Sequence, residues 1–163
     1  MVLRRTGRRE RGRDRDLAAR ARAQGRPALA TRLAEAALAA SPARADDLKA
    51  GHRDAAAHAA ALAGSGGGKD DPPPDEAERA DFRRLALGWL KADLAARSKR
   101  LEADPKAGPD IRKSLDAWRQ DPDLAGVRDA GALEKLPEAE RPAWRTLWAE
   151  VDGLLKKAEI GHP

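Results

Sequence analysis

The glycine-rich segment over residues 64–69 is the first place in this sequence where chemistry is conceivable, because glycine-rich loops that end in lysine can bind phosphate. The phosphate-loop pattern requires glycine where Ala63 stands and serine or threonine where Asp70 stands. A carboxylate at that position would repel phosphate, and a bound Mg²⁺ ion would lack its hydroxyl ligand. Ser65 fails as a nucleophile elbow, since that turn also requires glycine in place of Ala63. We therefore interpret the segment as a connection rather than a site.

A second motif, His52-Arg53-Asp54, spells the catalytic triplet of protein kinases. The asparagine that would bind Mg²⁺ five residues after the aspartate is replaced by Ala59. Asp81-Phe82 is followed by arginine instead of glycine, and the sequence contains no glycine-rich loop paired with a strand lysine. Because 163 residues are also too few for a bilobed kinase domain, we interpret the triplet as a chance match.

The candidate metal ligands and acid–base groups do not converge either. Cysteine is absent, which excludes disulfides, thiolate metal sites and cysteine nucleophiles. His52 and His58 are six residues apart, so a helix would place them on different faces. The carboxylates lie three or four residues from arginines, as on solvated helix faces, and the four tryptophans have the helical spacing of a packed core. We expect a chain that is not an enzyme and that has no metal or cofactor site.

The composition favours helices. Alanine alone contributes 37 residues, whereas isoleucine, valine and tyrosine together contribute only five, which argues against a sheet. No run approaches 18 apolar residues, so no membrane span is predicted. No apolar segment follows the basic N-terminus as it would in a secretory signal, and we expect a cytoplasmic location.

The positive charge is concentrated at the N-terminus. Residues 1–26 contain ten arginines and three acidic residues, and the remaining residues carry a net charge of −2. We expect a disordered arginine-rich arm over 1–26, with a weak helix over 16–24 that Gly25 stops. The candidate polyanion contacts in the arm are Arg4, Arg5, Arg8, Arg9, Arg11, Arg13 and Arg15.

Helical periodicity continues beyond the arm. It predicts N-terminal helices within 27–63, over 27–40 and 44–63, and a main helical domain over 75–160. Between them, residues 64–74 form a Gly/Pro-rich linker loop. Within the main domain the predicted helices cover 75–103, with Asp75 as N-cap, then 110–119, 129–136 and 137–158, the last weakened or bent by Pro142. The predicted core comprises Phe82, Leu85, Trp89, Leu90, Leu94, Leu115, Trp118, Trp144, Leu147, Trp148, Val151 and Leu155.

Several strings of residues resemble a known family. They are ADDLKAGHR at 45–53, AAALAG at 59–64, WLKADL at 89–94, WRQDPDLAGVRD at 118–129, LPEAER at 136–141 and the tryptophans at 144 and 148. Together they resemble the C-terminal tetratricopeptide-type tail of large bacterial serine/threonine protein kinases. The resemblance implies a short helical-hairpin array with a C-terminal capping helix, acting as a non-catalytic interaction or capping module for a protein partner.

The sequence departs from that family in two respects. The family usually continues Tyr-Asn-Ala-Ala-Cys after the His-Arg pair, whereas DAAAH stands at 54–58, so the hairpin over 51–63 should be looser here. The kinase domain and the upstream repeats are missing. A hairpin repeat buries its face only against neighbouring repeats, so we interpret the chain as an orphaned or truncated relative of the tail.

The alternative function is weak, non-specific binding of nucleic acid or another polyanion through the arm. If about six phosphates are neutralised, the logarithm of the affinity for duplex DNA should fall with the logarithm of the salt concentration at a slope of about −5. Binding should be indifferent to base sequence, because phosphate contacts do not read bases. A titration at low and moderate salt measures the slope. Equally tight binding by a chain that lacks residues 1–26 would contradict this alternative.

Overall fold

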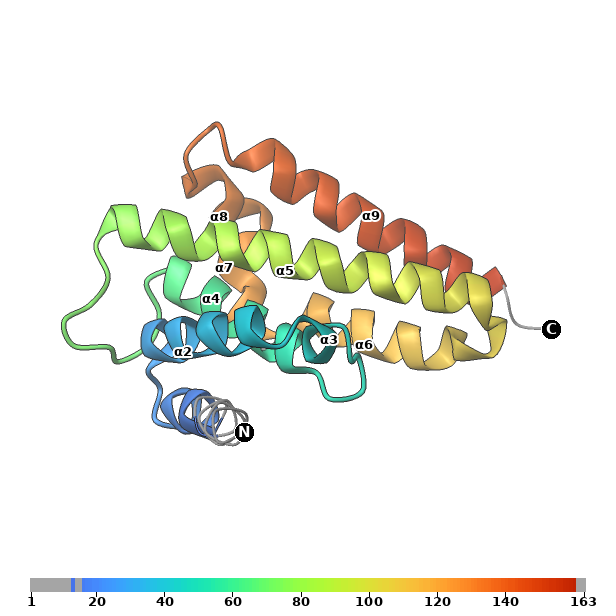
Figure 1. Ribbon diagram of the computed structural model, residues 1–163. Helices are drawn as coiled ribbons and strands as arrows, with labels where there is room; N and C mark the ends of the chain where they lie inside the picture. The colour runs from blue at the N-terminus through green and yellow to red at the C-terminus, as the bar shows by residue number, and fades with distance from the viewer. Residues whose placement is uncertain (1–12, 14–15, 161–163) are drawn as a thin grey trace, which may run out of the picture. The chain divides into compact units, whose positions relative to one another are not determined.

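The computed structural model describes residue 13 and residues 16–160, and over these residues it contains helices and turns but no strand (Figure 1). The predicted all-α class is confirmed. The chain divides into two compact units, Met1–Trp89 (unit 1) and Leu90–Pro163 (unit 2), and the boundary lies inside α5 (Glu76–Ala103) instead of in the loop over 64–74. In the described part of the chain, no helix combines the length and hydropathy needed to cross a membrane.

Residues 16–23 of unit 1 are helical, and this helix ends before Gly25, which adopts a φ of +72°. This is the weak helix predicted over 16–24, but it is packed instead of forming part of a disordered arm. Its buried Ala21 belongs to one apolar cluster with Ala30 and Ala59. Alanine side chains let three helices approach closely, so packed helical structure is present on the N-terminal side of the predicted boundary at residue 26.

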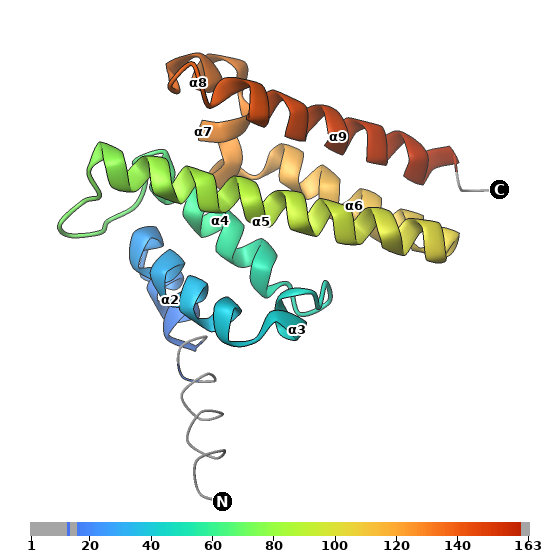
Figure 2. The same ribbon diagram turned by 45° about the horizontal axis from the view of Figure 1, so that its top comes forward.

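The next helices of unit 1 are α2 (Pro27–Ala40), α3 (Pro42–Ala45) and α4 (His52–Gly64). α2 and α4 pack side by side (Figure 2). The prediction of one continuous helix over 44–63 is wrong for about the first third of that range. The Asp47 carboxylate accepts the amides of Lys49 and Ala50 in a turn, and Gly51 then takes a left-handed φ of +66°. Both features interrupt a helix, and α4 starts only after them.

The loop over 64–74 is attached to the start of α2. The Asp70 carboxylate accepts the backbone N–H groups of Ala28 at 2.9 Å and Leu29 at 3.1 Å, and the Lys69 amide donates to Gly25 at 2.7 Å. No side chain near Arg26 caps α2 locally. The first turn of α2 is therefore capped by the carboxylate of Asp70, a residue that follows α4 in the sequence.

At the end of the same loop, Asp75 accepts the Glu78 amide at 2.8 Å. The predicted N-cap of α5 is thus confirmed. The C-terminal end of α4 has a charged partner as well: Arg83, which is 3% exposed, donates through Nη1 to the Gly64 carbonyl at 2.8 Å. The two ends of the loop over 64–74 are both held by hydrogen bonds between charged side chains and the backbone.

Unit 2 contains the end of α5 followed by η1 (Pro105–Ala107), α6 (Gly108–Gln120), η2 (Pro122–Leu124), α7 (Ala125–Arg128), α8 (Ala130–Lys135) and α9 (Arg141–Ile160). α9 packs against α6, α7 and α8. Gly108 lies so close to α9 that a Cβ there would be 2.9 Å from the Ala158 carbonyl oxygen. Three of the predicted core side chains, Leu85, Trp89 and Trp148, are half-buried. The other predicted core side chains are buried, namely Phe82, Leu90, Leu94, Leu115, Trp118, Trp144, Leu147, Val151 and Leu155.

The prediction for the last helix is wrong at its N-terminus. α9 starts at Arg141 instead of Pro137, so Pro142 lies in the first turn and does not bend the second. In a first turn the missing N–H of proline leaves no intrahelical hydrogen bond unmade.

Trp148 has a polar role besides packing, since its indole N–H donates to the Val127 carbonyl at 2.8 Å.

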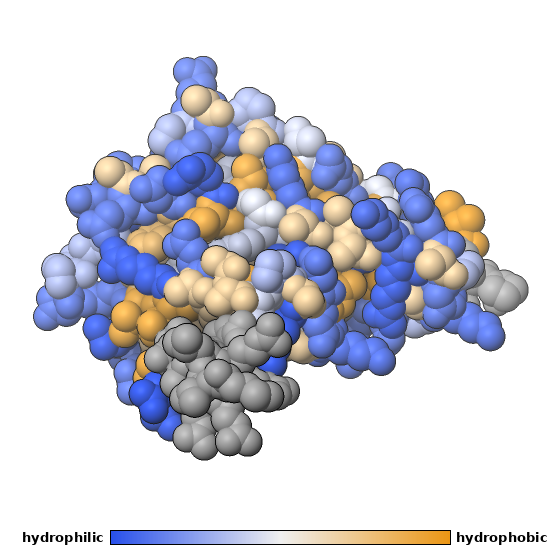
Figure 3. All heavy atoms as spheres, viewed as in Figure 1, coloured by the Kyte–Doolittle hydropathy of each residue, from blue (hydrophilic) through white to orange (hydrophobic). Residues whose placement is uncertain are grey.

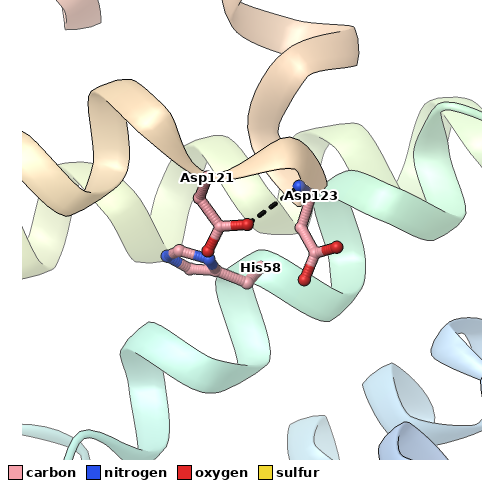
Figure 4. A group of neighbouring side chains, drawn as sticks. All are labelled: His58, Asp121 and Asp123. Atoms are coloured by element: carbon pink, nitrogen blue, oxygen red, sulfur yellow. Dashed lines mark hydrogen bonds between the residues drawn. The ribbon is translucent and has the colours of Figure 1, made fainter.

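Charged and polar side chains also close the turn after α6. The Asp121 carboxylate accepts the Asp123 amide at 2.9 Å (Figure 4). Arg128 Nη1 donates to the carbonyls of Trp118 at 2.9 Å and Asp121 at 2.8 Å. The Trp118 carbonyl has no intrahelical partner because α6 ends there, whereas the Asp121 carbonyl also accepts the Leu124 amide at 3.2 Å. The cation is also favourable at this end of the helix dipole.

We expect the Asp70→Ala substitution to lower the free energy of unfolding by about 1 kcal/mol, since it removes the only side-chain cap described at the start of α2. Urea denaturation followed by circular dichroism measures the change. Asp71→Ala is the matched control, because Asp71 is exposed and forms no hydrogen bond with another described residue. Equal loss in both variants would mean that the cap does not stabilise α2.

We expect Arg128→Met to lower the free energy of unfolding by about 2 kcal/mol, because two carbonyls lose a charged donor while the apolar stem is kept. The control is Arg119→Met. Arg119 makes an exposed ion pair with Asp152 at 3.7 Å, and loss of such a pair costs below about 1 kcal/mol. Thermal unfolding of both variants compares them, and a midpoint for Arg128→Met no lower than that of the control would refute the expectation.

Candidate functional site

A cavity of about 520 Å³ lies within unit 1, bounded by the helix over 16–23, α2, the start of α3 and α4. Its volume falls in the range of about 300–1,000 Å³ that is typical of small-molecule sites. Figure 3 shows hydrophobic side chains over α2 on one face of the molecule. The apolar side chains that line the cavity are Ala18, Ala19, Ala23, Ala30, Ala34, Ala37, Leu38, Ala55, Ala56 and Ala59.

The spacing of alanines on two helices explains why this space exists. Ala30, Ala34 and Ala37 share one face of α2, and Ala55, Ala56 and Ala59 share one face of α4. The cluster of Ala21, Ala30 and Ala59 holds the three helices in contact at one edge of the cavity. Beyond that edge a methyl group does not reach across, whereas leucine or isoleucine would fill the gap.

The polar side chains that line the cavity are cationic or neutral. They are Arg22 on the helix over 16–23, Ser41 between α2 and α3, Arg44 on α3 and His52 at the start of α4. Arg22 and Arg44 are exposed, and Ser41 and His52 are half-buried. No carboxylate lines the described walls, so this part of the unit presents positive charge beside methyl groups.

The neighbouring carboxylates have other partners. Asp46 accepts Arg53 Nη1 at 2.7 Å, and Asp47 accepts the backbone amides of the turn before α4. Asp54 lies 3.3 Å from Nε2 of the buried His58, the histidine on α4 labelled in Figure 4. Each carboxylate therefore compensates a charge or a backbone donor away from the cavity walls, and none of them is among the lining residues.

Of the residues proposed from sequence as polyanion contacts, only Arg13 lies within the described part of the chain, and it is exposed. Arg4, Arg5, Arg8, Arg9, Arg11 and Arg15 lie outside the described residues. The rejected nucleophile Ser65 donates its hydroxyl to the Ala61 carbonyl at 2.8 Å, which is a local helix-end contact.

Sequence reasoning missed the cavity. The sequence does contain a pattern that accompanies the cavity. Alanines stand at positions i, i+4 and i+7 of α2 and at positions i, i+1 and i+4 of α4, and the basic residue Arg44 lies between the two helices. The same stripes of alanine are equally typical of two helices in tight contact. The stripes line a cavity because the helix over 16–23 forms its remaining wall, and the sequence pattern does not predict where that helix packs.

Two smaller cavities have more polar walls. One of about 360 Å³ lies between α5 and α9 in unit 2 beside Lys91, Glu150 and Lys157. The other, of about 230 Å³, lies in unit 1 beside the Arg32–Glu78 ion pair. Comparison of the chain with models of protein families, with curated proteins and with solved structures finds no match.

Proposed function

We propose that the chain is a non-catalytic helical binding module and that the alanine-lined cavity of unit 1 is its ligand site. The observation that carries the proposal is the combination of apolar walls, about 520 Å³ of space and a few polar side chains among the lining residues. Binding sites for small molecules have this composition, in which apolar walls supply affinity and a few polar groups fix orientation.

The proposed kinship with the tetratricopeptide-type tail of bacterial serine/threonine kinases is consistent with this role. α2 and α4 pack as the two arms of a helical hairpin, and the helix over 16–23 covers one side of them. In arrays of hairpins the ligand binds on helix faces that neighbouring repeats leave open. In this proposal the alanine-rich hairpin provides the binding face, and α9 is the capping helix at the other end of the chain.

An uncharged hydrophobic dye, Nile red, tests the site directly. We expect saturable fluorescence enhancement with one dye per chain, because the cavity is apolar. Ala34→Phe on α2 and Ala55→Phe on α4 each place a ring in the cavity and should weaken dye binding at least about tenfold, since the dye would lose most of its contact area. Both alanines are half-buried, so the larger side chain does not overpack a closed core.

The matched control is Ala36→Phe, which makes the same substitution at an exposed position of α2 that does not line the cavity. Circular dichroism checks that all three variants keep the helical content of the parent chain. Dye affinity that is equal in the cavity variants and the control would refute the proposed site.

A further inference from the structure

The walls of the cavity restrict the class of ligand beyond the statement that it is apolar. The apolar walls belong to α2, α4 and the helix over 16–23, which border about 520 Å³ of space. An extended chain of methylenes between these walls would contact methyl groups of all three helices.

The basic side chains among the lining residues indicate which polar group the ligand carries. Arg44, Arg22 and His52 belong to three different helices, and all three line the cavity with their basic side chains. Arg44 forms no ion pair with any other residue that the structure describes. The acidic side chains closest in sequence, Asp46 and Asp47, pair with Arg53 and with backbone amides instead. Arg44 is thus not neutralised by the acidic side chains of its own segment.

We propose that the cavity binds a long-chain carboxylate, with the alkyl chain between the alanine faces and the carboxylate beside Arg44. This inference rests on the proposed function and specifies its ligand class. Arginine suits a carboxylate because its guanidinium offers several donors in a plane. Ser41, which precedes α3 and also lines the cavity, can donate a neutral hydrogen bond to the same group.

The test compares three ligands with the same twelve-carbon chain below their micelle concentrations: dodecanoate, dodecanol and dodecylammonium. Each displaces Nile red from the full chain. We expect dodecanoate to bind most tightly and dodecylammonium least tightly, with about 1.5-fold to fivefold between neighbouring ligands, as for exposed charge pairs. The advantage of dodecanoate should shrink in high salt because the interaction is screened. Shortening the chain should weaken binding by about fourfold for each methylene.

Arg44→Glu should reverse the order, so that dodecylammonium binds more tightly than dodecanoate. Arg20→Glu is the matched control, because Arg20 is an exposed arginine on the helix over 16–23 that does not line the cavity. The control should keep the order of the parent chain. If Arg20→Glu reverses the order as well, the effect is one of net charge and the assignment of the headgroup site is overturned.

The remaining outcomes separate the two proposals. If the three ligands bind equally and Ala34→Phe weakens all of them, the binding module stands and the carboxylate inference is overturned. If Ala34→Phe affects none of them, both proposals are overturned. If the chain binds phosphatidylglycerol vesicles but not monomeric dodecanoate, it recognises a membrane surface, and the inference of a single-chain ligand is overturned.

Discussion

Helix ends are the constraint on which this structure depends, because a chain of mostly short helices has many backbone groups without intrahelical partners. Charged side chains from other segments satisfy several of them. Asp70 accepts two amides at the start of α2, Arg83 donates to the last carbonyl of α4, and Arg128 donates to two carbonyls at the end of α6. Each charge also has the sign that the helix dipole favours at that end. These contacts fix where consecutive helices begin and end within each unit.

The alanine content of unit 1 makes these polar contacts more important there. An alanine side chain buries little apolar area, so each helix pair gains less from burial than a leucine-rich pair would. The cluster of Ala21, Ala30 and Ala59 brings backbones close but cannot fill the space beside them. Unit 2 has larger side chains, with Trp118, Trp144 and Leu147 almost fully buried. The cavity and the reliance on helix caps therefore have the same cause, which is the choice of alanine.

What could be predicted from sequence is what depends on local spacing. The all-α class, the N-cap Asp75 and the burial of Trp118 and Trp144 follow from propensity and periodicity, which neighbouring residues determine. The start of α4 could not be predicted, because it depends on the left-handed conformation of Gly51. Contacts between segments that are distant in the sequence could not be predicted either. Asp70 was interpreted as a linker residue, although it caps α2. The cavity depends on how three helices pack against one another, which periodicity within each helix does not specify.

The alanine walls of the cavity in unit 1 also have an energetic consequence. Methyl groups bury less apolar area than larger side chains at the same positions would, so burial stabilises this unit less than it would stabilise a filled interface. A ligand bound between these walls would bury more apolar area, and it would stabilise the folded unit in proportion to the logarithm of its concentration above Kd. Substitutions that merely enlarge the alanines would give the same stability without a ligand.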